Sequence, residues 1–299
     1  MSGHLIHIGY AKAGSHFVRH WFRAHPQLDF MHSGIAGFRN VFDLARRSVE
    51  PSRDVRWRVT SAEELASPRP NLREIVFDRD WGGPIPEAQA RARDILAELF
   101  PGATILLLTR GFRTLLLSGY SEYVREGGDR DFLDMLARGN GSGDQRGEHA
   151  WNYDYLIGLY RAAFGERVIV LPYELLSADS SAFLRVLEAR LGVDRFELPT
   201  ERLYPSLSPV ELCWYPRITR VVRRLPLRGR VRDALYRRYV RGVTRNAWAR
   251  PIGVLQRLFP RTPVTDSLIS DANVEFFRGR ADSLRHDPVY APYAQEYLF

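Results

Sequence analysis

Apolar runs alternate with amphipathic helical periods along the first two thirds of the chain, and this alternation constrains the fold more than any other feature. Runs that end at glycine, proline or a charged residue predict buried strands at residues 4–9, 74–77, 104–109 and 168–171. Apolar residues at three- and four-residue spacing predict helices at residues 15–24, 87–100, 112–126, 150–164 and 180–191. Such alternation predicts an α/β fold, in which helices flank both faces of a central, mainly parallel sheet.

The chain is long enough for one large core and a smaller cap. It has 299 residues, of which 45% are hydrophobic. From about residue 205 the strand pattern stops, and the sequence becomes helical, rich in arginine and aromatic. We therefore predict a single domain over residues 1–299, with a core at about 1–200 and a helical cap at about 205–299.

The cellular location is predicted from three features of the sequence. No run of eighteen or more apolar residues occurs, and Met1 leads into a strand-like segment without a signal-peptide pattern. Cys213 is the only cysteine, which excludes an intrachain disulfide and a cysteine-based metal cluster. These features predict a cytoplasmic protein.

A phosphate-binding loop is predicted near the N-terminus. Residues 6–17 form a strand, a short loop bounded by Gly9 and Gly14, and a helix that opens at Ser15. Backbone N–H groups at a helix N-terminus favour an anion, and small residues let the backbone approach it closely. Of 43 basic residues only Lys12 is lysine, and it lies in this loop. A nucleoside-triphosphate P-loop would place lysine directly after the second glycine, whereas Lys12 precedes Gly14 by two positions.

This order resembles the 5′-phosphosulfate loop of the sulfotransferases that use 3′-phosphoadenosine 5′-phosphosulfate (PAPS). The family pattern is Pro-Lys-Ser/Ala-Gly-Thr-Thr between a strand and a helix. Here Ala11 replaces the proline, and Ser15 and His16 replace the two threonines, so that only one hydroxyl is kept. The resemblance implies that the loop binds the donor through Lys12, Ala13, Gly14, Ser15, His16 and Phe17.

Two further segments are similar to the same family. Arg110 follows an apolar strand and Ser118 comes eight residues later, followed by Tyr120, which looks like the family's motif for the 3′-phosphate. A guanidinium fork suits a phosphate, and a serine adds a neutral donor. Residues 168–176 resemble a strand that ends in Tyr-Glu-Asp-Leu, and through this resemblance Tyr173 or Glu174 is a candidate contact to the donor. Together the resemblance covers about residues 4–192.

The resemblance implies the sulfotransferase fold, which is P-loop-like, and transfer of a sulfuryl group from PAPS to an acceptor hydroxyl, leaving adenosine 3′,5′-bisphosphate (PAP). Negative charge builds on the departing phosphate oxygen, so a preorganised cation is most effective there. We assign this role to Lys12. The chemistry requires no metal, and no ligand spacing such as HExxH occurs in the sequence.

An acceptor hydroxyl also needs a general base, for which the sequence offers two candidates. Asp80 follows the predicted strand at 74–77, at the sheet edge where such folds build their sites. Some bacterial family members have a Ser-x-Glu at this strand end. His32 follows another short strand-like piece and has a suitable intrinsic pKa. Acidic residues after strands are often turn formers, and a lone histidine is more often structural.

The net charge of +8 comes from one segment, residues 217–250. It holds twelve arginines against one acid, Asp233, an excess of eleven that leaves −3 for the rest of the chain. The arginines alternate with apolar and aromatic residues at helical spacing. Three interpretations stay open: solvated helix faces, an electropositive funnel for PAPS or an anionic acceptor, and peripheral contact with an anionic membrane through Arg217 to Arg250.

Two other function classes compete with the sulfotransferase. A P-loop-like small-molecule kinase is disfavoured by the position of Lys12. A nucleic-acid-binding module would need stacking aromatics in a basic groove, which Tyr236, Tyr239 and Trp248 could supply, and we do not expect a nucleic-acid partner. The acceptor is open, since sugar, lipid, phenol and polyketide hydroxyls all suit a capped cleft.

Overall fold

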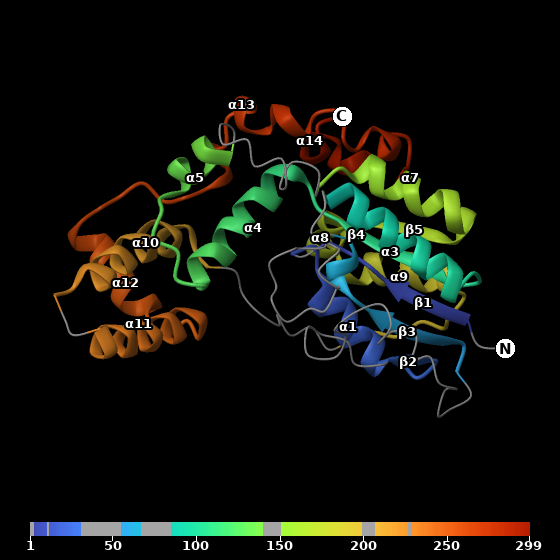
Figure 1. The fold of residues 1–299 in the computed structure, drawn as a ribbon, viewed down its shortest axis with the longest axis horizontal. Helices are drawn as coiled ribbons and strands as arrows, with labels where there is room; N and C mark the ends of the chain where they lie inside the picture. The colour runs from blue at the N-terminus through green and yellow to red at the C-terminus, as the bar shows by residue number, and fades with distance from the viewer. Residues whose placement is uncertain are drawn as a thin grey trace. The chain divides into compact units, whose positions relative to one another are not determined.

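The computed structural model describes residues 3–10, 12–30, 55–66, 85–139, 151–198, 207–226 and 229–299. The chain divides into two compact units (Figure 1). Unit 1 consists of Met1–Gly111, Asp144–Leu203 and Phe277–Phe299, and unit 2 consists of Phe112–Gly143 and Tyr204–Phe276.

Unit 1 is built on a parallel sheet of five strands in the order β2-β3-β1-β4-β5. Central strand β1 pairs with β3, with Ile6 opposite Thr60, and with β4, with Ile6 opposite Ile105. All six residues of β4 are buried, as expected for a strand covered on both faces. The strands are β1 (Gly3–His7), β2 (Leu28–Phe30), β3 (Trp57–Ser61), β4 (Thr104–Thr109) and β5 (Val168–Pro172).

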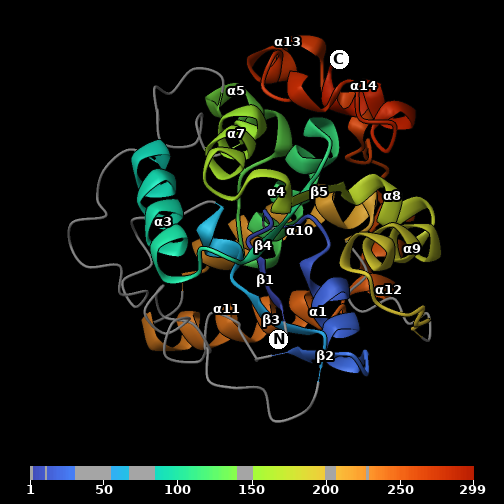
Figure 2. The same ribbon diagram turned by 90° about the vertical axis from the view of Figure 1, so that its right-hand side faces the viewer.

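Helices cover both faces of this sheet. Figure 2 shows α3 and α7 on one side of the strands and α1, α8 and α9 on the other. Buried aromatic residues fill the space beneath them, among them Trp21, Phe164 and Phe183. The helical segments of this part are α1 (Ser15–Ala24), η1 (Glu63–Leu65), α3 (Ile85–Leu99), α7 (Tyr153–Phe164), η3 (Gly165–Arg167), α8 (Tyr173–Ala178) and α9 (Ser180–Leu191).

The predicted α/β fold with a mainly parallel sheet is therefore confirmed. The predicted helices at 15–24 and 180–191 agree with α1 and α9, and the strand at 104–109 agrees with β4. The sequence did not predict β3, which supplies one neighbour of the central strand. The strand predicted at 74–77 lies outside the described residues.

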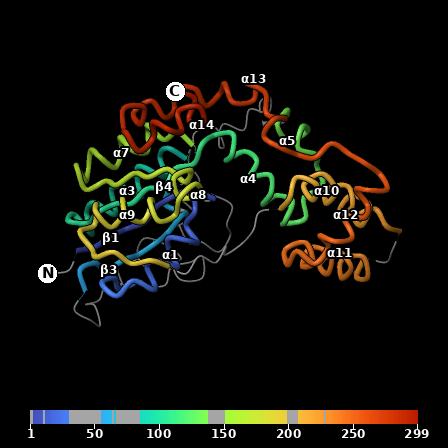
Figure 3. The backbone as a smooth tube through the Cα atoms, turned by 180° about the vertical axis from the view of Figure 1, so that it is seen from behind, coloured from blue at the N-terminus to red at the C-terminus, as the bar shows by residue number. Residues whose placement is uncertain are grey.

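The C-terminal residues belong to unit 1. Asp154 N donates to Arg280 O at 2.9 Å, and the rings of Tyr153 and Tyr297 lie 6.1 Å apart. Figure 3 shows α14 beside α7, in agreement with these contacts. This segment forms η6 (Asp282–Leu284), η7 (Ala291–Tyr293) and α14 (Ala294–Tyr297), and η5 (Glu275–Phe277) precedes it at the boundary between the units.

Unit 2 is helical and contains most of the predicted cap. A capping box starts α10, where Ser208 and Glu211 each bond to the other's backbone N–H. Tyr215, Tyr239 and Ile252 form part of its core. Its helical segments are α4 (Phe112–Arg125), α5 (Phe132–Gly139), α10 (Pro209–Arg224), α11 (Gly229–Thr244), α12 (Ala249–Leu258), η4 (Asp266–Leu268) and α13 (Asp271–Val274). Among the described residues, every helix is too short or too polar to span a bilayer.

Candidate functional site

Three strand ends of unit 1 meet where the strand order reverses. The chain places β2 and β3 on one side of β1 and then β4 and β5 on the other. In an open parallel sheet, ligands bind outside the carboxyl ends of the strands at such a switch point. Lys12 lies in the loop after β1, Arg110 follows β4, and Tyr173 follows β5.

The loop after β1 is held in an unusual backbone conformation. Lys12 has a φ of 68° and Gly14 a φ of 91°, both in the left-handed region. A Cβ added to Gly14 would lie 2.5 Å from Leu176 Cδ2 and 3.1 Å from Tyr173 Cδ2. Glycine is therefore needed at position 14 for the backbone conformation and for the close approach of α8.

The loop leads into the N-terminus of α1, which is suited to an anion. The first turn carries no acidic residue, and no side chain of the described residues caps the helix. Ser15 is buried, and its Oγ has no hydrogen-bond partner within the described part of the chain. The N-terminal N–H groups and the helix dipole favour negative charge, and the Ser15 hydroxyl can add a donor. These residues fit a bound phosphate or phosphosulfate.

Arg110 joins this loop to the end of β5. Its Nη1 donates to the Lys12 carbonyl oxygen at 2.6 Å, and its guanidinium lies 4.2 Å from the centroid of the Tyr173 ring. Burial lowers the pKa of Arg110 from its usual value, and nearby Tyr173 and Glu174 oppose this shift. An arginine remains protonated at neutral pH, so the site holds a partly desolvated cation beside the loop.

A buried network of hydrogen bonds fixes the backbone at Arg110 and Gly111. Tyr153 Oη donates to the Arg110 carbonyl oxygen at 2.6 Å, and the Gly111 N–H donates to Glu174 Oε1 at 2.9 Å. Tyr297 Oη lies 2.8 Å from Glu174 Oε2 and 2.9 Å from Thr109 Oγ1. Burial raises the pKa of Tyr297 well above its usual value, so its phenol stays protonated and donates to Glu174. The C-terminal segment thus fixes the ends of β4 and β5.

We expect Tyr297→Phe to lower the free energy of unfolding by about 1–3 kcal/mol, because it leaves buried partners of the hydroxyl unsatisfied. Denaturant unfolding measures this change. Tyr155→Phe is the matched control: it removes a bond to Pro86 O at 3.0 Å from an exposed tyrosine and should change stability by less than about 0.5 kcal/mol. Equal effects of the two substitutions would contradict a structural role for the network.

His7 lies at the end of β1 but is not available for proton transfer. It is fully buried, and its Nδ1 lies 2.8 Å from Ser61 Oγ at the end of β3. Burial, with a smaller contribution from Arg19, lowers the pKa of His7 to about 3. The imidazole is therefore neutral at physiological pH.

The structure brings together several of the residues predicted from sequence. The Arg110 guanidinium donates a hydrogen bond to the backbone carbonyl oxygen of Lys12, and Gly14 packs against Tyr173. Ala13 and Ser15 are buried, His16 is exposed, and Phe17 is half-buried on the first turn of α1. Donor binding by these residues stays a prediction.

Other predicted residues lie elsewhere. Ser118 is on α4 in unit 2, so its pairing with Arg110 stays a prediction. Tyr120 is a core residue of unit 2, and its hydroxyl oxygen lies 3.2 Å from the Arg130 carbonyl oxygen and 3.3 Å from that of Leu212, either of which can accept its proton. Both candidate bases, Asp80 and His32, lie outside the described residues. Tyr153 and Tyr297 were not predicted, because nothing in their local sequence marks a contact with Arg110.

Comparison with known proteins decides the fold. No protein-family model matches the sequence, and no curated protein matches it. Among solved structures, a sulfotransferase from Alicyclobacillus acidocaldarius is similar over 69% of this chain and 87% of its own, with 17% sequence identity and a TM-score of 0.51. The fold is that of a sulfotransferase.

A second sulfotransferase structure, mouse SULT7A1 complexed with PAP, is similar over 65% of this chain and 60% of its own. The sequence identity is 13% and the TM-score 0.38. At that score the likeness supports no further conclusion. The sulfotransferase fold itself agrees with the family resemblance of the loop around Lys12.

Proposed function

We propose that this protein transfers a sulfuryl group from PAPS to an acceptor hydroxyl. One observation carries the proposal: Arg110 contacts the Lys12 loop beside the uncapped N-terminus of α1, at the switch point of a sulfotransferase fold. Two cationic residues, Lys12 and Arg110, and the backbone N–H groups at the start of α1 therefore lie close together at the carboxyl ends of β1 and β4. A donor with phosphate groups at two positions suits such a site.

The 5′-phosphosulfate is assigned to the loop and the start of α1. Its charge would be met by Lys12, by N–H groups of the first turn and by the Ser15 hydroxyl, which is buried and lacks a partner in the described part of the chain. The 3′-phosphate is assigned to Arg110. Because burial destabilises its charged form, an anion at the guanidinium would recover electrostatic energy.

The reaction is an in-line displacement at sulfur. The bond between sulfur and the 5′-phosphate oxygen breaks, the acceptor oxygen bonds to sulfur, and PAP leaves with the electron pair. Lys12 stabilises the charge that grows on the departing oxygen. The acceptor proton passes to a base, for which Asp80 and His32 remain the candidates.

The test uses PAPS carrying labelled sulfur and a panel of phenolic, sugar, lipid and polyketide hydroxyls. We expect label in a sulfate ester and release of one PAP for each ester formed. ATP labelled on its terminal phosphate is the parallel arm. Transfer of that phosphate in place of sulfur would contradict the proposal and identify a small-molecule kinase.

A further inference from the structure

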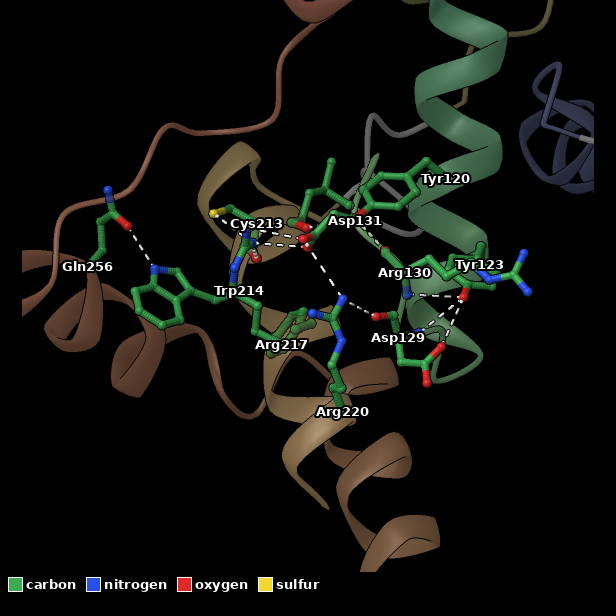
Figure 4. A network of polar contacts seen from close by, with 12 residues as sticks. Tyr120, Tyr123, Asp129, Arg130, Asp131, Cys213, Trp214, Arg217, Arg220 and Gln256 are labelled. Atoms are coloured by element: carbon green, nitrogen blue, oxygen red, sulfur yellow. Dashed lines mark hydrogen bonds and ion pairs between the residues drawn. The ribbon is translucent and has the colours of Figure 1, made fainter. Parts of the chain in front are cut away.

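The arginines of residues 217–261 include two sets with different surroundings, and those of the first set make ion pairs and hydrogen bonds within unit 2. Arg217 Nη1 lies 3.2 Å from Asp131 Oδ1, and Arg220 Nη2 donates to the Asp129 carbonyl oxygen at 2.8 Å (Figure 4). Arg223 Nη1 lies 3.0 Å from Asp129 Oδ2. These arginines connect α10 to the segment between α4 and α5. Their positive charge is balanced within unit 2 by the carboxylates of Asp129 and Asp131.

The second set is exposed. Between Asp233 and Asp266 the sequence contains no acidic residue, and every arginine of this stretch is exposed. None of them forms an ion pair in the described part of the chain. These arginines are Arg237, Arg238, Arg241, Arg245, Arg250, Arg257 and Arg261.

Exposed apolar side chains lie among these arginines on α12 and at the residue that follows it. Val254 is 55% exposed, Leu258 67% and Phe259 61%. Arg250, Val254 and Leu258 follow one another at four-residue spacing and share a helix face, whereas Ile252 on the opposite face is buried. We call the exposed residues of α11 and α12 with Phe259 the basic apolar surface.

Of the three aromatic residues that a nucleic-acid site could use, two are held within unit 2 and only Trp248 is exposed, at 39%. Tyr239 is buried and its Oη donates to the Tyr215 carbonyl oxygen at 3.0 Å, while Tyr236 Oη donates to the Gly127 carbonyl oxygen at 3.0 Å. The Arg223 guanidinium also lies 5.0 Å from the centroid of the Tyr236 ring, so that neither tyrosine offers a free ring face for stacking on bases. The exposed apolar groups are mostly aliphatic, which suits hydrocarbon better than a base.

We propose that the basic apolar surface docks the protein on an anionic lipid membrane. Arginines near such a membrane are attracted by its negative surface potential, and Leu258 and Phe259 enter the boundary between headgroups and acyl chains. Charge attraction and apolar insertion together account for exposed cations and exposed apolar residues that follow one another closely, as Arg250, Val254 and Leu258 do on one face of α12. This proposal does not depend on the sulfuryl transfer proposed above.

The test is flotation of the full chain with vesicles. We expect binding to vesicles of phosphatidylcholine and phosphatidylglycerol in equal parts, weak binding to phosphatidylcholine alone, and loss of binding as salt rises. The combined Arg237→Gln, Arg238→Gln and Arg241→Gln variant should bind on the order of a hundredfold more weakly, about fivefold for each arginine. Leu258→Ser with Phe259→Ser should weaken binding by about tenfold or more.

The matched control neutralises three exposed arginines of unit 1, Arg161, Arg185 and Arg190, and should leave vesicle binding nearly unchanged. Thermal unfolding of every variant shows that each is folded, and PAP binding measures the proposed donor site separately. Absence of binding to the anionic vesicles would overturn the proposal, as would an equal loss in the control. Tight binding of a single-stranded oligonucleotide without vesicle binding would also overturn it, in favour of nucleic acid.

Discussion

Replacing Lys12 with alanine is expected to lower turnover by about a hundred- to a thousandfold, while donor binding falls far less. The reason is that the charge met by the ammonium grows toward the transition state, so its loss affects kcat more than ground-state affinity. Steady-state kinetics with PAPS, together with PAP titration, separate the two quantities. Lys12→Arg keeps the charge but not the compact geometry and should restore activity only in part.

Lys12 also offers a direct chemical test, because it is the only lysine of the sequence. Reductive methylation can mark only its ammonium group and the α-amino group of the chain. Saturating PAP should protect Lys12 and leave the α-amino group reactive, so the latter is an internal control. Equal labelling of Lys12 with and without PAP, or full activity of Lys12→Ala, would remove this residue from the mechanism.

The second large effect is expected at Arg110. Arg110→Ala should weaken PAP binding by about 1.5–3 kcal/mol, the cost of losing a charged hydrogen-bond partner, which is roughly ten- to a hundredfold in Kd. Adenosine 5′-phosphosulfate lacks the 3′-phosphate and should bind the wild type and the variant alike. A variant that loses the same affinity for both ligands would show that Arg110 does not recognise the 3′-phosphate.

Arg167 provides the matched control for this substitution. It also bonds backbone carbonyl oxygens of unit 1, those of Ala103 and Pro101, but at the amino end of β4. Arg167→Ala should therefore leave PAP binding unchanged even where it lowers stability. Comparable loss of PAP affinity in both variants would indicate a general effect on unit 1.

Local sequence was sufficient to predict the elements that position the site. The apolar run of β4 and the periodicity of α1 are strong signals, because both elements bury apolar side chains at regular intervals. The position of Lys12 between two glycines indicated an anion loop, and its left-handed φ agrees with a tight turn there. Arg110 was predicted at the end of β4, where the structure has it.

Other features depend on contacts between distant residues. The sequence did not predict β3 because the charged residue Arg58 interrupts the apolar run between Trp57 and Val59. This segment becomes a strand through its pairing with β1. Tyr297 reaches Glu174 across 123 positions of sequence, and a tyrosine near a chain end carries no local signal for such a contact. Likewise, the sequence could not separate the arginines that pair with Asp129 and Asp131 from those that are exposed.

Calorimetric titration of the wild-type protein with PAP and with adenosine 5′-monophosphate tests the central claim most directly. The claim is that the Lys12 loop and Arg110 together form a site for a nucleotide with phosphates at both the 5′ and the 3′ positions. The account predicts that PAP binds roughly ten- to a hundredfold more tightly than adenosine 5′-monophosphate, through the charged bonds to the 3′-phosphate. Equal affinity for the two nucleotides, or no binding of PAP, would contradict it.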